Sequence, residues 1–198
     1  VIGNFLQTLK DEGRYDGALI IVTSDNGEML GEHGEQTHSY FIYESAVRVP
    51  MIIKPPGETK ASVVSAPVGL VDIMSTVCAA LGIEPPSVSH GIDLSVTWRG
   101  GKSIPADRDL YSESLVPTKY GANGLMSLRH EQWKYIYTSR PELYDVIANP
   151  QEDRNRYESD ATTSQEMMQA LTQLLTTTTR TVTEAGKTVD DQTMQRLE

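Results

Sequence analysis

The chain has little of several features that would assign it to a specialised class of protein. Cys78 is its single cysteine, so no internal disulfide can form and cysteine usage does not indicate a compartment. Lys and Arg nowhere form a run longer than two, and the formal net charge is -10. Binding to a nucleic acid or to an anionic membrane surface requires a concentrated basic patch. We therefore expect neither as a partner.

Long hydrophobic runs are also lacking. A helix that spans a bilayer needs about 20 consecutive apolar residues, whereas the longest run here, Ala18–Val22, has the length of a strand. We therefore expect no membrane span. No signal peptide is visible, and the chain begins without Met in a segment that already has helical spacing. The sequence does not determine the compartment, and a periplasmic or secreted location is compatible with it for a complete protein. It does not determine the oligomeric state either.

What the sequence does contain is the pattern of an α/β fold. With 38% hydrophobic residues, the 198-residue chain can build a substantial core. Residues 18–23 and 49–54 are apolar, β-branched runs that are typical of buried parallel strands. We expect them to be neighbours or near neighbours in one mainly parallel sheet. The polar segment between them, residues 24–39, is long, and long loops in compact domains are usually functional.

The second half of the chain has a different composition. Short alternating segments predict a small antiparallel sheet in which residues 124–129 pair with residues 133–138. Apolar residues at helical spacing predict helices over residues 68–81, ending at Gly82, and over residues 164–175. We expect three parts: an α/β part over residues 1–105, a small antiparallel-sheet-plus-helix subdomain over residues 106–180, and a tail over residues 181–198.

The chemistry is predicted to lie where the first strand ends. Asp25, Asn26 and Gly27 follow this strand, and ligands of open α/β sheets bind just beyond the carboxyl ends of strands. The Asp25 carboxylate and the Asn26 carbonyl offer two adjacent oxygens, which suit a hard cation such as Ca²⁺ or Mg²⁺. The alternative is an Asx-type turn, in which both side chains bond nearby backbone amides. Taken alone, the dipeptide favours the turn.

The surrounding residues change that balance because they resemble the sulfatase family in an ordered series of motifs. These are TSDNGEMLGEHGEQTHSYFIYESAVRVPMIIKPPG, then PVGLVDIMSTVCAALGIEPP, then SLRHEQWKYIYTSRPELYDVIANPQEDRN. The resemblance covers residues 1–160. It implies an α/β fold, namely the C-terminal part of an alkaline phosphatase-like α/β sandwich followed by a small C-terminal antiparallel α+β subdomain.

The resemblance also implies roles for three residues. Asp25 and Asn26 correspond to two ligands of the family's metal ion, expected to be Ca²⁺ with Mg²⁺ or Mn²⁺ as alternatives. His38 lies where related enzymes have a Lys or His that contacts the sulfate or the leaving-group oxygen, although many members carry it one position later, at Ser39 here. Histidine exchanges a proton near neutral pH, so His38 is suited to protonating a departing alkoxide. The alternative is a loop histidine bonded to the backbone.

Other matched residues have structural interpretations. His33 either lines the pocket mouth or holds its loop. We expect Glu44 and Arg48 to hold the second strand in place, and a pairing of Arg48 with a carboxylate would be a buried scaffold interaction rather than part of catalysis. His90 and His130 lie in segments that predict a connection and a turn, which favours structural roles.

The family's nucleophile has no counterpart in this sequence. It is a Cys or Ser, converted to formylglycine, within a Cys/Ser-x-Pro-x-Arg motif. Cys78 is followed by Ala79-Ala80-Leu81 in an apolar helical segment, so it reads as a buried, inert thiol. We therefore expect the formylglycine and the remaining metal ligands on a missing N-terminal part.

These observations predict the C-terminal portion of a metal-dependent sulfuric ester hydrolase, inactive by itself, whose substrate is a small-molecule or carbohydrate sulfate ester. A phosphonate or phosphate ester hydrolase of the same superfamily is the nearest alternative, since it would keep the pair formed by Asp25 and Asn26. A non-catalytic domain is the second alternative. The missing nucleophile segment distinguishes the two kinds of hydrolase, and Ca²⁺ binding or hydrolysis of an aryl sulfate distinguishes an enzyme from a non-catalytic domain.

Overall fold

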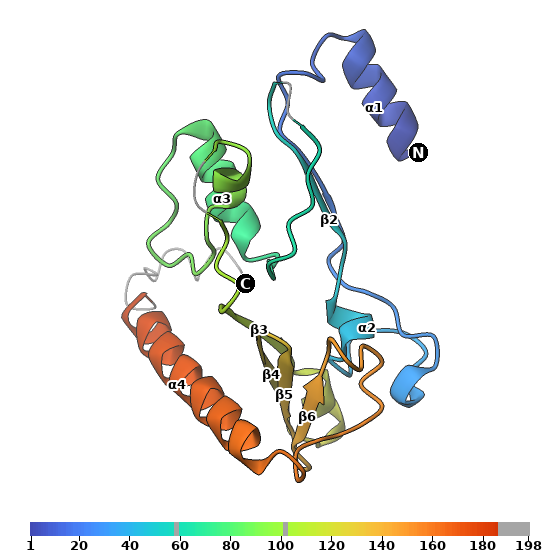
Figure 1. Ribbon diagram of the computed structural model, residues 1–198, viewed down its shortest axis with the longest axis vertical. Coiled ribbons are helices and arrows are strands. Elements are labelled where there is room, and N and C mark those ends of the chain that lie inside the picture. The colour runs from blue at the N-terminus through green and yellow to red at the C-terminus, as the bar shows by residue number, and fades with distance from the viewer. Residues whose placement is uncertain (58–59, 101–102, 186–198) are drawn as a thin grey trace, which may run out of the picture.

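The two predicted N-terminal strands form a two-stranded sheet (Figure 1). The computed structural model describes residues 1–57, 60–100 and 103–185. Within it, β1 (Ile20–Thr23) pairs with β2 (Met51–Lys54), and Ile20 lies opposite Lys54. The strands are neighbours, as predicted, but they run antiparallel, so the prediction of a mainly parallel arrangement was wrong for this pair.

The direction was mispredicted because a continuous apolar run indicates only that both faces of a strand need cover. Here the long intervening loop returns the chain alongside β1. The Lys54 ammonium closes the end of the ribbon by donating to the carbonyl oxygens of Tyr15, Asp16 and Ala18 at 2.6, 2.8 and 3.2 Å. The residues of β1 are half-buried, and Ile52 of β2 is 64% exposed.

The predicted helices form with small changes in their limits. α1 covers Ile2–Asp11, and α3 covers Asp72–Leu81, with Gly82 after it at φ 68 in the left-handed conformation that glycine adopts readily. α3 begins later than predicted because the Asp72 carboxylate accepts the Gly69 N–H at 2.8 Å and so fixes a turn ahead of the helix. The short α2 (Glu44–Val47) was not predicted.

The C-terminal half contains the predicted antiparallel sheet. Its four strands are ordered β3-β4-β5-β6, and each pairs antiparallel with its neighbour. The predicted pairing of the two central strands is confirmed. The bounds are Asp109–Ser114 for β3, Leu125–His130 for β4, Trp133–Tyr137 for β5 and Glu142–Asp145 for β6.

The two faces of this sheet serve different purposes. Successive residues of a strand point to opposite faces, and Tyr135 and Ile136 on β5 illustrate this. Tyr135 packs in a core with Met167 and Leu171 of α4 (Ala161–Ala185), a longer helix than the predicted one. Ile136 packs instead in a second core. Its other members come from the segment between β1 and β2 (Met29, Ile42, Tyr43 and Ala46) and from the C-terminal sheet and the residue after it (Leu125, Tyr144 and Val146). The sheet therefore supports the loop that carries the predicted site.

The described residues form a mixed α/β structure with two antiparallel sheets. The division at residue 106 stays a prediction, and of the predicted tail, residues 186–198 lie outside the described residues. Across the part of the chain that the structure describes, no helix is both long and apolar enough to cross a membrane.

A buried ion pair joins α3 to the segment that leads into β3. The Arg108 guanidinium donates to both Asp72 carboxylate oxygens at 2.6 and 2.9 Å, and the Ile92 N–H donates to the same carboxylate at 2.9 Å. The Asp72 side chain is 0% exposed. Burial alone would raise the pKa of Asp72, but the Arg108 guanidinium and the backbone donors hold that pKa below its ordinary value of 3.8.

We expect Asp72→Ala to lower the free energy of unfolding by about 3–5 kcal/mol, because it leaves a largely buried guanidinium and two backbone N–H groups without their acceptor. Glu12→Ala, which removes an exposed pair with Arg14, should cost about 1 kcal/mol or less. Urea titration measures both changes.

Because the pKa of Asp72 is lower in the folded state, the stabilisation is present above about pH 4 and is lost as the pH falls through the folded pKa. Equal losses of stability in the two variants would contradict a stabilising role for the buried pair between Asp72 and Arg108.

Candidate functional site

The residues that follow β1 bind one another through short-range hydrogen bonds. Ser24 Oγ donates to the Asn26 carbonyl oxygen at 2.7 Å, the Asn26 backbone N–H donates to Asp25 Oδ1 at 3.1 Å, and Asn26 Nδ2 donates to the Gly27 carbonyl oxygen at 2.7 Å. These bonds occupy the nitrogen of the Asn26 amide. Among the described residues, Asp25 Oδ2 and Asn26 Oδ1 have no hydrogen-bond partner. Two side-chain oxygens are thus left to accept a cation.

The donor chemistry of this pair fits a hard cation, but the pair is a partial site. Ca²⁺ takes six to eight oxygen ligands. The described residues contain no group of three or more His, Cys, Asp or Glu that could hold a metal ion. Asp25 and Asn26 supply two side-chain oxygens, so a cation bound there would need further ligands. The assignment of both residues as ligands stays a prediction.

Gly27 brings the metal-ligand candidates against α2. Its N–H donates to the Ala46 carbonyl oxygen at 2.7 Å, and a Cβ atom at this position would lie 2.0 Å from the Ser45 carbonyl oxygen. A side chain at residue 27 therefore requires the backbone to move. This close approach gives a physical reason for the glycine after Asp25 and Asn26.

The long loop after Gly27 is an ordered, folded-back segment. The Met29 N–H donates to the Thr37 carbonyl oxygen and the Gly31 N–H donates to the Glu35 carbonyl oxygen, both at 2.9 Å. Met29 is 0% exposed and anchors the outgoing arm in the core. The Glu35 carboxylate fixes the returning arm by accepting the N–H groups of Tyr40 and Phe41 at 3.1 and 2.9 Å.

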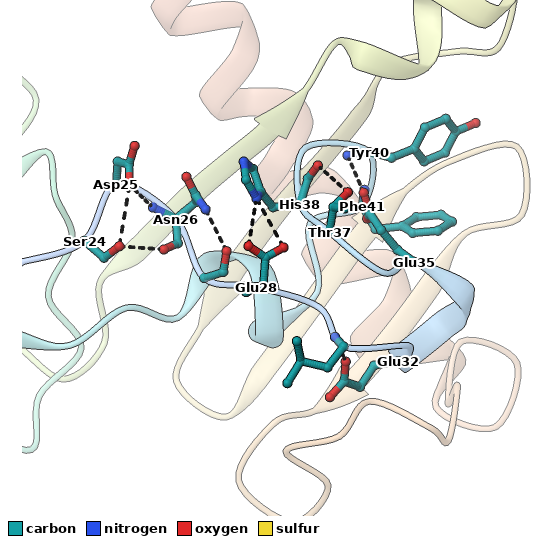
Figure 2. A network of polar contacts seen from close by, with 12 residues as sticks. Ser24, Asp25, Asn26, Glu28, Glu32, Glu35, Thr37, His38, Tyr40 and Phe41 are labelled. Atoms are coloured by element: carbon teal, nitrogen blue, oxygen red, sulfur yellow. Dashed lines mark hydrogen bonds and ion pairs between the residues drawn. The ribbon is translucent and has the colours of Figure 1, made fainter.

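His38 lies on the returning arm, and its imidazole contacts a carboxylate. Nδ1 is 3.3 Å from each carboxylate oxygen of Glu28. Among the described residues, the ring makes no hydrogen bond to the backbone, which was the alternative arrangement for this histidine. In Figure 2 the side chains of Asp25, Asn26 and His38 point to the same side of the loop, with Glu28 beneath the imidazole. Glu28 was not predicted from the sequence to be part of the site.

The three predicted site residues line one cavity of about 860 Å³. The cavity wall also carries Glu44 and several cationic side chains: Arg48, Arg108, Arg129 and Lys134. A polar wall with both acidic and basic groups suits a negatively charged ester better than an apolar ligand. The structure thus brings Asp25, Asn26 and His38 together, although it leaves their chemical roles as predictions.

A buried charged network holds the returning arm to the C-terminal sheet. Lys134 Nζ on β5 lies 3.2 Å from Glu44 Oε1 and 3.1 Å from Glu152 Oε1, and Arg129 Nη1 lies 3.5 Å from Glu44 Oε2. The side chains of Glu44, Lys134 and Glu152 are at most 6% exposed. Glu152 also accepts the Glu44 N–H at 2.5 Å, while burial raises the pKa of Glu152 above its ordinary value.

These contacts decide two interpretations that the sequence left open. Glu44 does hold its segment in place, whereas Arg48 is exposed and forms no buried scaffold pair among the described residues. His33 stacks on Tyr43 with ring centroids 3.6 Å apart, and its Nε2 lies 3.0 Å from the Gln151 carbonyl oxygen. His33 therefore holds the loop. No local signal could have identified the Glu44 network, because the partners lie 90 and 108 residues along the chain.

Comparisons with known proteins point to one family. The sulfatase family model matches residues 1–83, the N-terminal part of this chain. An N-acetylglucosamine-6-O-sulfatase from Bacteroides thetaiotaomicron is 32% identical over 162 residues, which cover 78% of this chain and 29% of that protein. The similarity therefore continues beyond the segment that the family model matches, whereas the chain spans less than a third of this relative's length.

Solved structures agree with this similarity. The protein BT4656, solved in complex with its substrate D-glucosamine-2-N,6-O-disulfate, matches this chain with a TM-score of 0.79 and 31% identity. The match covers 90% of this chain and 38% of BT4656. A phosphonate monoester hydrolase from Silicibacter pomeroyi has a TM-score of 0.70 and 28% identity, covering 90% of this chain and 38% of that one.

Proposed function

Because this chain belongs to the sulfatase family and shares its alkaline phosphatase-like fold, we propose that it is the C-terminal portion of a metal-dependent sulfuric ester hydrolase. The observation that carries this proposal is the single cavity lined by Asp25, Asn26 and His38. The chain covers 29% of the related N-acetylglucosamine-6-O-sulfatase, so the activity is proposed for the complete enzyme.

In this proposal Asp25 and Asn26 supply two oxygen ligands for Ca²⁺, with Mg²⁺ or Mn²⁺ as alternatives. Both have a side-chain oxygen that no described residue bonds, which supports the assignment. When bound, the cation would offset the negative charge of the sulfate oxygens. The nucleophile would be a formylglycine from sequence outside these 198 residues, and His38 would donate a proton to the departing ester oxygen.

The substrate class that we propose is a carbohydrate sulfate ester. The related enzyme from Bacteroides thetaiotaomicron is an N-acetylglucosamine-6-O-sulfatase, and a structural neighbour was solved with a sulfated glucosamine as its substrate. An alkoxide from a sugar is a poor leaving group. A proton donated by His38 to the departing oxygen would therefore lower the barrier to its departure.

A phosphonate or phosphate ester hydrolase is the second candidate, and the similarity to a phosphonate monoester hydrolase supports it. The two candidates are separated by assaying the complete enzyme with an aryl sulfate and with the matching aryl phosphonate, after chelation and after Ca²⁺ is restored. We expect faster, Ca²⁺-dependent turnover of the sulfate. Faster turnover of the phosphonate would favour the second candidate over the sulfatase. If neither substrate is turned over, the remaining hypothesis is a non-catalytic domain.

We also expect these 198 residues, expressed alone, to show no turnover of an aryl sulfate above background. They contain only the two proposed metal ligands, Asp25 and Asn26, and no Cys/Ser-x-Pro-x-Arg motif. The measurement is release of the aryl alcohol in the presence of Ca²⁺, with heat-denatured protein as the control. Metal-dependent release by the chain alone would contradict the proposed division of the site.

A further inference from the structure

The geometry of the folded-back loop points to a role for Glu28. The two hydrogen bonds between its arms join residues 29 and 37 and residues 31 and 35. In both pairs the residue numbers have the same sum, as in a β-hairpin, and the next pair outward in this register is Glu28 and His38. Side chains of opposed residues in such a register lie beside each other. The contact between Glu28 and His38 is thus built into the loop.

Both ends of this contact are held in place. Glu28 lies between Gly27, which is pressed against α2, and Met29, which is 0% exposed. On the other arm, the hydroxyl of Ser114 at the end of β3 donates to the carbonyl oxygen of Ser39, directly after His38. Ser39 has φ 99, a conformation that non-glycine residues adopt only where the surroundings impose it. The backbone on each side of the contact is therefore fixed.

The contact also fixes which nitrogen of His38 carries a proton. An ionised carboxylate only accepts hydrogen bonds, so Nδ1 at 3.3 Å from both Glu28 oxygens must be the donor. Nε2 lies on the opposite edge of the ring and has no hydrogen-bond partner among the described residues. In Figure 2 it is the ring nitrogen that points away from Glu28, toward the side on which Asp25 and Asn26 present their oxygens.

From these observations we propose that Glu28 is a positioning residue that aims Nε2 of His38 at the leaving-group oxygen. The inference rests on the proposed hydrolase function. The donor is the ring with a proton on both nitrogens. As the bond from the nucleophile to sulfur forms and the bond from sulfur to the ester oxygen breaks, the proton on Nε2 moves to that oxygen. The ring is left neutral with its remaining proton on Nδ1, the form that Glu28 stabilises, and it regains a proton from solvent before the next turnover.

The contact between Glu28 and His38 should matter for catalysis rather than for the stability of the fold. The two side chains are 43% and 51% exposed, and pairs with such exposure contribute little to stability. Removing the Glu28 carboxylate should therefore leave the melting temperature almost unchanged. If the pair orients the ring, the loss appears in catalysis, where a small misplacement of a reacting group lowers the rate by up to about 10²-fold.

The test compares two substrates in the complete enzyme: p-nitrophenyl sulfate, whose leaving group needs little protonation, and phenyl sulfate, whose leaving group needs more. We expect Glu28→Ala to lower kcat by about 10- to 100-fold on phenyl sulfate and several-fold less on p-nitrophenyl sulfate. Glu35→Gln removes charge from a carboxylate of the same loop that holds the backbone, and should affect both substrates equally. Glu166→Gln, on the exposed side of α4, should affect neither.

Two further measurements separate positioning from a structural effect. Combining Glu28→Ala with His38→Ala should be no worse than His38→Ala alone, because both act through one proton transfer. Nitrogen-15 NMR of the imidazole should show the neutral His38 ring protonated on Nδ1 in the parent and moving toward Nε2 protonation in Glu28→Ala. An equal loss on both substrates, full additivity, or an unchanged tautomer would overturn the role of Glu28.

The parent enzyme is the control for the underlying function. If it turns over neither aryl sulfate, the proposed hydrolase function fails and this inference fails with it. If the parent is active and Glu28→Ala shows no dependence on the leaving group, the hydrolase proposal stands and the positioning role alone is rejected.

Discussion

Replacing Asp25 with alanine in the complete enzyme will abolish turnover while leaving the protein folded. Asp25 carries the charge of the proposed ligand pair, and a site for a divalent cation depends on neutralising that charge. Its carboxylate is exposed, and within the described part of the chain it accepts hydrogen bonds only from Ser24 and Asn26. The fold therefore loses little when the carboxylate is removed. Metal content, melting temperature and turnover number, measured on the same preparation, give the result.

Two other variants make this experiment decisive. Asn26→Asp retains an oxygen ligand and adds charge, so it should keep some metal binding with altered selectivity. Asp16→Ala makes the same change at the opposite end of β1, where the side chain is also exposed, and should leave all three measurements unchanged. If Asp25 serves only a turn, Asp25→Ala would cost about 1 kcal/mol of stability and turnover per folded molecule would survive. A folded Asp25→Ala enzyme with near-normal turnover ends the ligand assignment.

Removing the imidazole of His38 should have the second largest effect. We expect His38→Ala to lower turnover by roughly 10²–10⁴-fold, the usual contribution of a general acid, while metal content stays near that of the parent. His130→Ala is the matched control, because His130 is 40% exposed and its Nδ1 also pairs with a carboxylate, that of Asp109 at 2.9 Å. It should retain full turnover. Parental kcat in His38→Ala, or a parallel loss of bound metal, would contradict a role in proton donation.

Much of the fold could be predicted where the signal is local. Gly82 stops α3 because it adopts a conformation that suits glycine, and residues 124–138 form a hairpin because alternation and a turn occur in adjacent segments. The direction of β2 relative to β1 depends on the path of the 27 residues between Thr23 and Met51, which no local pattern encodes.

The candidate site divides in the same way. Asp25, Asn26 and His38 could be identified because they occupy motif positions near one another in the sequence. Glu28 was missed because its relation to His38 follows from the register of the loop, which two backbone hydrogen bonds set. The Glu44 network was missed because Lys134 and Glu152 come from strands and loops remote in sequence, and a lysine within an alternating strand gives no sign that it is 2% exposed.

The Glu44 network has a consequence for the engineering of chimeric enzymes. An exchange of C-terminal sheets between relatives, intended to transfer substrate preference, would separate Glu44 from Lys134 and Glu152 unless the donor sheet supplies equivalents. The Glu44 carboxylate would then remain buried without the ion pairs that Lys134 and Arg129 supply, a strongly destabilising arrangement. A viable recombination boundary must therefore keep the three residues from one parent, or replace all three together with apolar side chains of similar volume.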